Sequence, residues 1–449
     1  MRRSYWTKLH RALRQVERQQ WLSRDEIAAL GWERQKSLVR HAYEHSRFYR
    51  RKYDAAGFHP DDLQDADDFA RIPVLTKDEV RENIADIVCS GVSQKRLVPE
   101  YTGGSTGVPL MVYRDANAAH FGYAIYLRTI HAWGLEVGCK IAYIWHRSNV
   151  KYDFTRRSRW HRYIKNRVML DAADMSKSKM ARFVELLRSF KPDLIIGYPS
   201  STAVFAGFLD ERGRAGFRPK ALWSTAEVVP DFQKELIERV FQSTVYDVYG
   251  SMEIPDYAAE CRERDGLHIN ADLRTLEIVD ERGTRLTTGR MGQVVVTDLV
   301  NYAAPLIRYR NEDVASLLDR TCPCGRGLPL MGKVTGRIYD MFVLPDGSQV
   351  YGNRFTHFFY DHVDEVRCFQ VHQTRTDRVT VRVVPTATCK PEALKAQIIQ
   401  AFTSYTGGQV QFDVSFVKEI EKETSGKFRF VKSDISKMRE FRAGSVFQA

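Results

Sequence analysis

The sequence predicts an α/β protein. A large N-terminal domain with mixed sheets, helices and a β-rich subdomain is followed by a small, mobile α+β C-terminal domain. Three observations predict this fold class. Short β-rich runs alternate with amphipathic stretches between residues 140 and 250, the pattern of a sheet with crossover helices. From about residue 276 short strands alternate with turn signals. Beyond Gly336, strands flank one helix over roughly 110 residues, close to a usual domain size.

The N-terminal domain is expected to span residues 1–336, beginning with a helical segment over about 1–95. Apolar side chains recur there at helical spacing among many charges. They are Trp6, Leu9, Leu13, Val16, Leu38, Ala42 and Phe48. In the stretch 73–83, Thr76 precedes Glu79 by three residues, which predicts a capped helix start.

The middle of the chain is expected to form the main sheet and its covering helices. Strands are predicted at 140–145, 192–198, 220–225 and 243–250, and helices at 180–190 and 231–241. The β-rich subdomain is predicted at 276–286 and 293–299. The C-terminal domain, residues 337–449, is expected to contain strands at 341–352, 378–385 and 410–420 and a helix at 391–405.

Composition indicates a globular protein with a substantial core. The chain has 449 residues, of which 43% are hydrophobic and 12% aromatic, and a formal charge of +12 that favours anionic partners. Charges interrupt every apolar run before the ~20 residues that a membrane span requires, and the first residues lack the apolar core of a signal peptide. Seven scattered cysteines do not suggest a disulfide framework. We therefore expect a soluble, cytoplasmic protein.

A run of small and hydroxyl residues lies between Tyr101 and Pro109. Successive backbone N–H groups and hydroxyls in such a run can surround a phosphate, and glycines allow close approach. The residues concerned are Thr102, Gly103, Gly104, Ser105, Thr106 and Gly107. The run lacks the lysine of a Walker A loop, and a plain glycine-rich turn is the alternative interpretation.

Three later motifs add chemistry that suits a nucleotide. Tyr249-Gly250-Ser251-Met252-Glu253 follows a predicted strand, Tyr309 to Asp313 follows the run 305–310, and Ser425-Gly-Lys427-Phe-Arg429 lies in a charged loop. An aromatic face suits a purine, a carboxylate suits a hard cation, and a carboxylate oxygen pair suits a vicinal diol. Each motif alone has another interpretation. The Tyr249 motif could be a plain turn, Asp313 could form a surface ion pair, and Lys427 could be a solvated loop lysine.

Together, in this order, the four motifs resemble the adenylate-forming superfamily, and in particular its phenylacetate-CoA ligases and their capsule-cluster relatives, across essentially the whole chain. The resemblance implies ATP-dependent activation of a carboxylic acid with Mg²⁺. It assigns the ATP β- and γ-phosphates to Thr102–Gly107, adenine to Tyr249, Mg²⁺ to Glu253 and the ribose hydroxyls to Asp313. Lys427 would bridge the substrate carboxylate and the α-phosphate, stabilising the transition state.

The resemblance also assigns flanking residues to the nucleotide site, and it shows departures. Gly250, Ser251 and Arg337 belong to matched motifs, while Ala226 and Glu227 resemble the Gly-Ala-Glu stretch beside adenine. The segment 336–340 resembles the hinge about which the C-terminal domain rotates for a second, thiol-transfer step. This chain departs from the family pattern at Met252, where a Thr is common, at Asn311-Glu312, where Thr-Gly is usual, and at Tyr339, where a carboxylate is usual.

Four residues predict a closed tetrahedral zinc site of the structural kind. They are Cys261, His268, Cys322 and Cys324, spaced as Cys-x6-His and Cys-x-Cys. Some phenylacetate-CoA ligase-like proteins contain a similar Cys/His cluster. Such a site would join the loop after Glu253 to the loop after Asp313. Reduced, buried cysteines are the alternative.

Residues for the acid pocket and the acyl acceptor are less defined. Tyr143, Trp145, His146, Tyr198 and Pro199 follow predicted strands, where open sheets bind ligands, and their aromatic rings suit an aryl or arylacetic acid; ordinary core packing is the alternative. The basic run 151–167 could hold coenzyme A phosphates, a polyanionic saccharide, nucleic acid or an acidic protein, or form a solvated basic face.

The leading hypothesis is an acid:CoA ligase that forms an acyl-AMP and then a thioester. A second hypothesis keeps the adenylate but passes the acyl group to an amine, a carrier protein or a sugar. A zinc-containing nucleic-acid-binding protein and a ligase that has lost turnover are the remaining alternatives, and nucleic acid is the less expected partner. Homodimers are common among the relatives, but the sequence decides neither the oligomeric state nor the acid.

Overall fold

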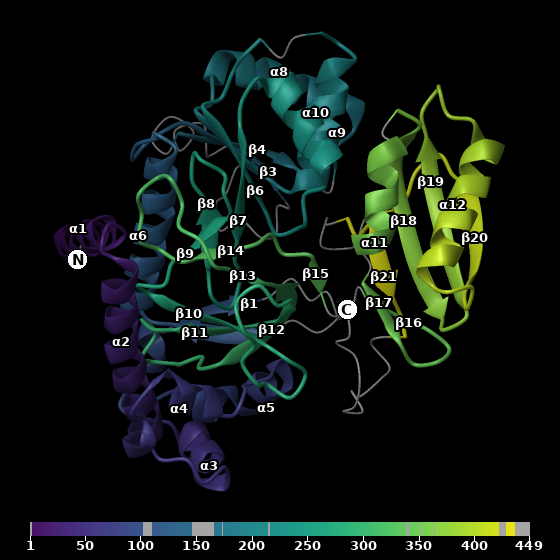
Figure 1. Cartoon of the computed structure of the whole chain (residues 1–449). Coiled ribbons are helices and arrows are strands. Elements are labelled where there is room, and N and C mark those ends of the chain that lie inside the picture. The colour runs from purple at the N-terminus through teal and green to yellow at the C-terminus, as the bar shows by residue number, and fades with distance from the viewer. Residues whose placement is uncertain are drawn as a thin grey trace.

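The computed structural model describes most of the chain. The described residues are 2–101, 110–145, 166–172, 174–213, 216–337, 341–351, 353–362, 364–421 and 428–435. Figure 1 shows a larger unit that carries the first residues and a smaller unit of strands and helices beside it. The predicted fold class is confirmed. Among the described residues, no helix combines the length and apolar character needed to cross a membrane.

Helices form the first part of the larger unit. They are α1 (Arg2–Gln19), α2 (Arg24–His45), α3 (Arg47–Ala55), α4 (Ala66–Arg71) and α5 (Lys77–Ile87). The predicted capped start is confirmed at α5, where the Thr76 side chain accepts from the Glu79 N–H and Glu79 accepts from the Thr76 N–H. Buried side chains of α2 to α5 share one core with the β-rich strands described below.

The main sheet has nine strands in the order β13-β14-β9-β8-β7-β6-β5-β3-β4. Its parallel strands are β3 (Ile141–Trp145), β4 (Arg167–Asp171), β5 (Leu194–Gly197), β6 (Ala221–Thr225) and β7 (Val245–Tyr249). Its antiparallel strands are β8 (Ala258–Glu260), β9 (Leu267–Ile269), β13 (Leu317–Leu318) and β14 (Leu330–Met331). The four predicted parallel strands are therefore present.

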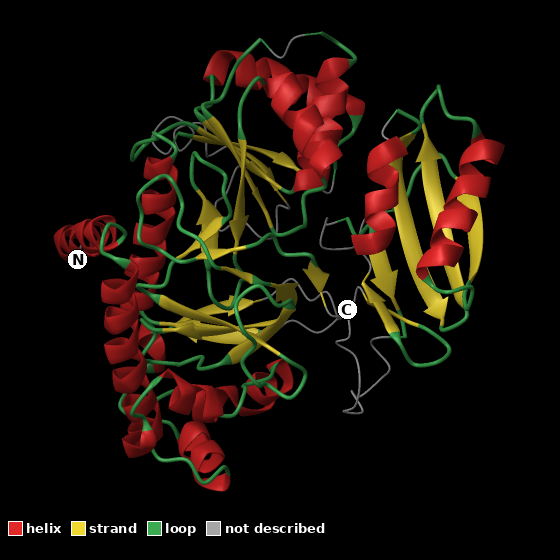
Figure 2. Ribbon diagram, in the orientation of Figure 1, coloured by secondary structure: helices red, strands yellow, loops and turns green. Residues whose placement is uncertain are grey.

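Helices cover both faces of this sheet (Figure 2). On one face, buried side chains of α8 (Lys177–Phe190), α9 (Pro199–Asp210) and α10 (Asp231–Phe241) pack against the strands. On the other face lies α6 (Ala116–Ala132), whose outer side packs against α1. The predicted helices at 180–190 and 231–241 lie within α8 and α10.

Two smaller sheets complete the larger unit. The order β10-β11-β12-β15 joins β10 (Arg274–Val279), β11 (Gly292–Asp298), β12 (Tyr309–Ala315) and β15 (Gly336–Arg337), all antiparallel. The second sheet is the pair β1 (Val98–Tyr101) and β2 (Met111–Arg114). β10 and β11 correspond to the predicted β-rich subdomain.

The smaller unit is an α+β structure. A hairpin of β16 (Met341–Val343) and β17 (Gln349–Tyr351) precedes α11 (Asn353–Phe358). The sheet β20-β19-β18-β21 contains β18 (Val366–Arg375), β19 (Arg378–Pro385), β20 (Gln411–Phe416) and β21 (Val431–Ser433), with α12 (Pro391–Tyr405) packed on it. The strand predicted at 378–385 is β19, and the helix predicted at 391–405 is α12; both have the predicted bounds.

Buried arginines connect the helical segment to the β-rich part. Arg128 forms a paired hydrogen bond with Asp272 at 2.7 and 2.9 Å, and both side chains are buried. Arg308 pairs with Glu277 at 3.0 Å and also donates to the carbonyls of Ala70 in α4 and of Ile72 just after it. A buried charge that loses its partner is strongly destabilising, so these pairs bind the layers to one another.

Candidate active site and metal centre

The loop after β7 is folded tightly on itself, which explains its glycine. A Cβ on Gly250 would lie 2.6 Å from the backbone nitrogen of Asp256, so only glycine fits without movement. The Ser251 N–H donates to the Ile254 carbonyl at 3.1 Å, and the Ser251 hydroxyl lies 2.7 Å from that of Tyr257. The loop thereby holds Glu253 in a fixed position at the end of the parallel strands.

Tyr249 and Asp313 lie side by side, as the predicted nucleotide site requires. The Tyr249 hydroxyl donates to Asp313 Oδ2 at 2.9 Å, and Asn311 Nδ2 donates both to that hydroxyl at 2.6 Å and to Asp313 Oδ2 at 2.9 Å. Burial and then the Asp313 charge raise the pKa of Tyr249 well above its ordinary value, so the phenol remains a donor. Asn311, one of the departures from the family pattern, therefore supports both residues.

Glu253 has its own buried phenol partner. The Tyr309 hydroxyl donates to Glu253 Oε1 at 2.8 Å, and the Glu253 side chain is only 6% exposed. Burial, followed by the charge of Glu253, raises the pKa of Tyr309 well above its ordinary value. Met252, by contrast, is exposed. One hydrogen-bonded carboxylate beside a nucleotide site is a donor set that suits Mg²⁺ held jointly with phosphates.

Glu312 occupies a backbone conformation that favours glycine. Its φ is 71°, and its carboxylate forms an ion pair with Lys77 at the start of α5. The left-handed conformation explains why the family pattern has glycine at this position. The departure at Glu312 thus adds a contact to the helical segment at the cost of backbone strain.

The proposed acid-pocket residues separate into two groups. Trp145 and Tyr198 stack face to face with ring centroids 4.2 Å apart and an interplanar angle of 23°. Pro199 is the first residue of α9. Tyr143 instead packs against the core under α6, and the Arg167 guanidinium lies 5.9 Å from its ring centroid. Arg167 is the first residue of β4, so the end of the basic run is part of the sheet and is not a free basic face.

Glu227, which was predicted to lie beside adenine, contacts two segments that are distant in the chain. Its carboxylate accepts hydrogen bonds from the Ser200 N–H at 3.1 Å and from the Phe428 N–H at 2.9 Å. Ala226, directly before it, has a φ of 71°. Sequence reasoning did not identify this contact, because Ser200 and Phe428 lie far from Glu227 in the chain.

Several predicted residues lie outside the described part of the chain. They are Thr102, Gly103, Gly104, Ser105, Thr106, Gly107, His146, Tyr339, Lys427 and the basic residues 151–165. Arg337 is described, and it pairs with Asp313 across β12 and β15.

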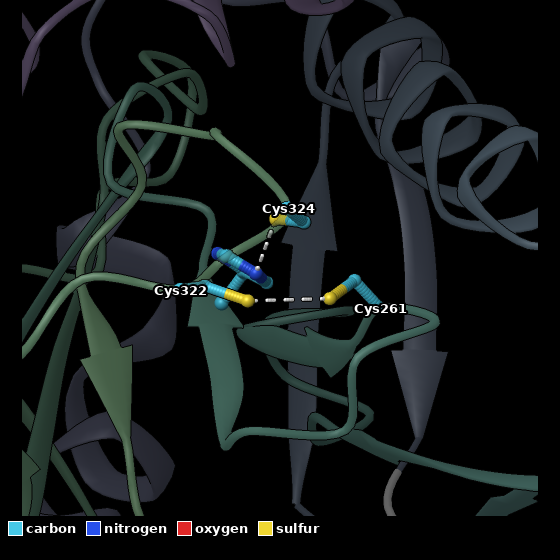
Figure 3. A group of neighbouring side chains, drawn as sticks. Cys261, Cys322 and Cys324 are labelled. Atoms are coloured by element: carbon cyan, nitrogen blue, oxygen red, sulfur yellow. Dashed lines mark hydrogen bonds between the residues drawn. The ribbon is translucent and has the colours of Figure 1, made fainter.

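The four predicted zinc ligands come together at one place (Figure 3). Cys261 follows β8, His268 lies in β9, and Cys322 and Cys324 lie in the loop between β13 and β14. The sulfurs of Cys261 and Cys322 are 3.5 Å apart, and Cys324 Sγ is 3.3 Å from His268 Nε2. All four donor atoms lie within 4.8 Å of one another. In a tetrahedral zinc site, sulfurs stand about 3.8 Å apart, so the residues fit this metal.

The chemistry of the cluster also suits a cation. Burial lowers the pKa of His268 to about 4, so its imidazole is neutral near pH 7. The His268 Nδ1 lies 3.3 Å from the Leu328 carbonyl, a contact that leaves Nε2 available as a ligand. Burial acts to raise the pKa of the Cys324 thiol, but hydrogen bonds and the charge of Arg326 outweigh it, so that pKa lies below its ordinary value.

The cysteine loop packs against the turn between α1 and α2. A Cβ on Gly327 would lie 1.9 Å from the Leu22 carbonyl oxygen, and the Gly327 N–H donates to the Gln20 carbonyl at 3.1 Å. Arg326 donates to Gln20 Oε1 at 2.8 Å and lies 4.8 Å from the ring centroid of Trp21. The cluster is therefore joined to the N-terminal helices, a contact that no local sequence pattern indicates.

The sequence is similar to a family model and to proteins with known names. A family model described as the CapK C-terminal domain matches residues 342–434. The chain is 31% identical over 357 residues to the phenylacetate-coenzyme A ligase of Aromatoleum evansii, covering 77% of this chain and 76% of the relative. It is 32% identical over 330 residues to the protein of that name from Escherichia coli (strain K12), covering 71% and 73%.

A solved structure extends the likeness to the fold of both units. The crystal structure of a 2-hydroxyisobutyryl-CoA ligase in the postadenylation state, in complex with R3-HIB-AMP, matches with a TM-score of 0.76 and 24% identity. The match covers 93% of this chain and 91% of that chain.

Proposed function

The chain belongs to the phenylacetate-coenzyme A ligase family, and we propose that it activates a carboxylic acid with ATP and passes the acyl group to coenzyme A. In the first step, a carboxylate oxygen attacks the α-phosphorus, the bond to the bridging oxygen breaks, and pyrophosphate leaves. In the second step, the thiol sulfur attacks the acyl carbon, loses its proton, and AMP leaves. The enzyme is thus an AMP-forming ligase.

The pairing of Tyr249 with Asp313, beside Tyr309 and Glu253, is the observation that carries this proposal. The two pairs join β7 and the loop after it to β12, which lies far away in the chain, with hydrogen bonds of 2.9 and 2.8 Å. In the proposed complex, Asp313 accepts from the ribose hydroxyls and the Tyr249 ring lies against adenine. A carboxylate with two oxygens can accept from both hydroxyls of a vicinal diol.

Glu253 is proposed to hold Mg²⁺ together with phosphate oxygens of ATP. Mg²⁺ is commonly bound by one or two carboxylates plus substrate phosphates, and when bound it neutralises charge on the leaving pyrophosphate. The Tyr309 hydroxyl orients the carboxylate by donating to one oxygen, which leaves the other for the cation. Lys427 is proposed to stabilise the charge that develops at the α-phosphate during carboxylate attack.

The half-buried Trp145, which stacks on Tyr198, is proposed to form a wall for an aryl or related acid. Flat aromatic walls favour a planar ring by offset or edge contacts. Tyr198 is fully buried and directly precedes α9, so its position is fixed by the core.

The cluster of Cys261, His268, Cys322 and Cys324 is proposed to hold a structural Zn²⁺. Three thiolates and one imidazole form a closed set, with no ligand position left for a substrate. All seven cysteines of the chain are free, which supports a reducing compartment such as the cytoplasm. We also propose that residues 337–449 form the domain that moves between the two steps.

The test is acid-dependent pyrophosphate release from Mg-ATP across a panel of aliphatic, aryl and arylacetic acids. Wild type is compared with Lys427→Ala and with Lys418→Ala, an exposed lysine of the same unit. We expect release with at least one acid, a loss of two or more orders of magnitude in Lys427→Ala, and no change in Lys418→Ala. ATP binding without release for any acid would contradict the proposed activity.

The acceptor is tested in the same assay with coenzyme A present or absent. Formation of an acyl-thioester that requires coenzyme A is the expected result. Acyl-AMP formation without thioester would instead favour an amine, a carrier protein or a sugar as acceptor. Salt-dependent DNA or RNA binding in the absence of ATP binding would favour the nucleic-acid alternative.

A further inference from the structure

The carboxylate of Glu227 joins the two units of the structure. It accepts from Ser200, the second residue of α9 in the larger unit, and from Phe428 in the smaller unit. The two bonds use different oxygens, Oε2 and Oε1, with lengths of 3.1 and 2.9 Å. One side chain therefore contacts both partners at once.

The larger unit fixes Glu227 through the start of α9. Tyr198 occupies the N-cap position of this helix without a side-chain cap hydrogen bond, so the first N–H groups depend on another acceptor. Glu227 supplies it from the loop after β6, at the end of the helix where the macrodipole favours negative charge. The hydrogen bond from Ser200 holds the carboxylate in place.

The smaller unit fixes Phe428 through its own core. Phe428 is 6% exposed, and its ring lies 4.8 Å from that of Phe430, which lies 5.0 Å from Phe369 in β18. The carbonyl of Arg429 accepts from Gln370, and that of Phe430 accepts from Val371. The Phe428 N–H therefore moves with the sheet of the smaller unit, so its bond to Glu227 reports the orientation of that unit.

A second contact between the units has a different character. Phe232, the second residue of α10, packs against the hydrophobic core of the smaller unit. Apolar contact is non-directional and permits rotation, whereas a charge-assisted hydrogen bond is stronger and directional. The orientation of the smaller unit is thus set by Glu227 more than by Phe232.

We propose that Glu227 is a positioning residue that holds the C-terminal unit in the orientation used for adenylate formation. The inference rests on the proposed function. Phe428 directly follows Lys427, and its N–H belongs to the planar peptide unit that joins the two residues. The contact with Glu227 is therefore made at the residue next to the proposed catalytic lysine in the sequence. The bond has to break before the unit rotates for the thioester step, so Glu227 acts in the first step alone.

The experiment measures the two steps separately in the full chain. Glu227→Gln keeps the side-chain volume but removes the charge and one acceptor oxygen. We expect single-turnover pyrophosphate release at saturating ATP and acid to fall roughly 10- to 100-fold, as expected for loss of a hydrogen bond to a charged group. Thioester formation from added phenylacetyl-adenylate and coenzyme A should be unchanged. Glu235→Gln, an exposed glutamate on α10, should change neither step.

A purely structural role would slow both steps equally, and that result would overturn the inference. A readout independent of activity is amide hydrogen exchange at Phe428. We expect at least tenfold faster exchange in Glu227→Gln than in wild type or Glu235→Gln, and unchanged exchange would also overturn it. Failure of the proposed function is distinguishable, because wild type itself would then release no pyrophosphate while the exchange result would stand.

Discussion

Tyr249 and Asp313, which are 64 residues apart, share a hydrogen bond of 2.9 Å from phenol to carboxylate. If Asp313 binds the ribose, Asp313→Ala should raise the KM for ATP roughly 10- to 100-fold, because a charged acceptor is lost. Tyr249→Phe keeps the ring and removes one donor, so we expect a rise of roughly threefold to tenfold. Steady-state kinetics with varied ATP measure both.

The matched control for this pair is Asp377→Asn in the turn between β18 and β19, where the carboxylate pairs with Arg375 at the surface. Its KM for ATP should equal that of wild type. An unaltered KM in Asp313→Ala would remove this residue from the nucleotide site.

Loss of zinc should lower the stability of the fold more than it impairs the catalytic step. Cys324→Ser is expected to lower the melting temperature by several degrees and to abolish about one equivalent of bound zinc, because a closed cluster contributes folding free energy. Elemental analysis and differential scanning calorimetry measure the two effects. Cys389→Ser, whose thiol lies in the C-terminal unit, is the control and should retain both metal and stability. Wild-type protein that contains no metal and melts identically after chelation would exclude the site.

Backbone strain at Glu312 predicts an unusual order of stabilities. Glu312→Ala and Glu312→Gly both lose the ion pair with Lys77, but only glycine relieves the left-handed conformation at φ 71°. The glycine variant should therefore be more stable than the alanine variant by about 1 kcal/mol, the reverse of the usual effect of glycine. Urea unfolding with equal m-values measures the difference. Equal stabilities would show that the backbone conformation at this position carries no strain.

Asp247 should make the protein less stable as the pH rises. Burial, followed by the charge of Glu260, raises the pKa of Asp247 from its ordinary value of 3.8 to about 7. Between pH 4 and 7 the folded state holds a proton that the unfolded chain has lost, so the free energy of unfolding falls across this window and stays low above it. Asp247→Asn should remove this loss and stabilise the protein at pH 8 by at most about 4 kcal/mol.

The effect of Asp247→Asn should shrink as the pH falls and vanish well below pH 3.8, where the unfolded chain is protonated as well. Asp210 provides a control of opposite sign, because its hydrogen bonds with Arg239 lower its pKa. Asp210→Asn should slightly destabilise the protein at neutral pH. Thermal melts of both variants from pH 4 to 8 test these two predictions. A gain in stability of Asp247→Asn that does not depend on pH would contradict the raised pKa of Asp247.

Local sequence signals predicted the elements that have a simple pattern. Thr76 with Glu79 indicated the start of α5, and the helix predicted at 391–405 has the bounds of α12. Two helices lack such a pattern. α6 and α9 are buried on most of their faces, so apolar and small residues occur without a polar stripe, and hydrophobic periodicity does not identify them.

β18 was missed for a different reason. Gln373 is fully buried, and it bonds to the backbone of Val343 and to Ser433. Glutamine is usually exposed, so a sequence does not predict that one is buried. The partners of its side-chain hydrogen bonds become known only from the fold. Likewise, the motifs predicted Tyr249 and Asp313 as neighbours, but the Glu227 contact with Phe428 depends on the placement of two units, which no local pattern encodes.

The contact of Arg326 with Gln20 has a consequence for synthesis of the protein. The two residues are separated by 306 positions, so the turn after α1 cannot acquire this partner until all the intervening residues have been made. The other side of α1 packs on α6 and on Leu273 and Val300, which also emerge later. α1 therefore leaves the ribosome before these partners do, and its apolar face needs protection while translation proceeds.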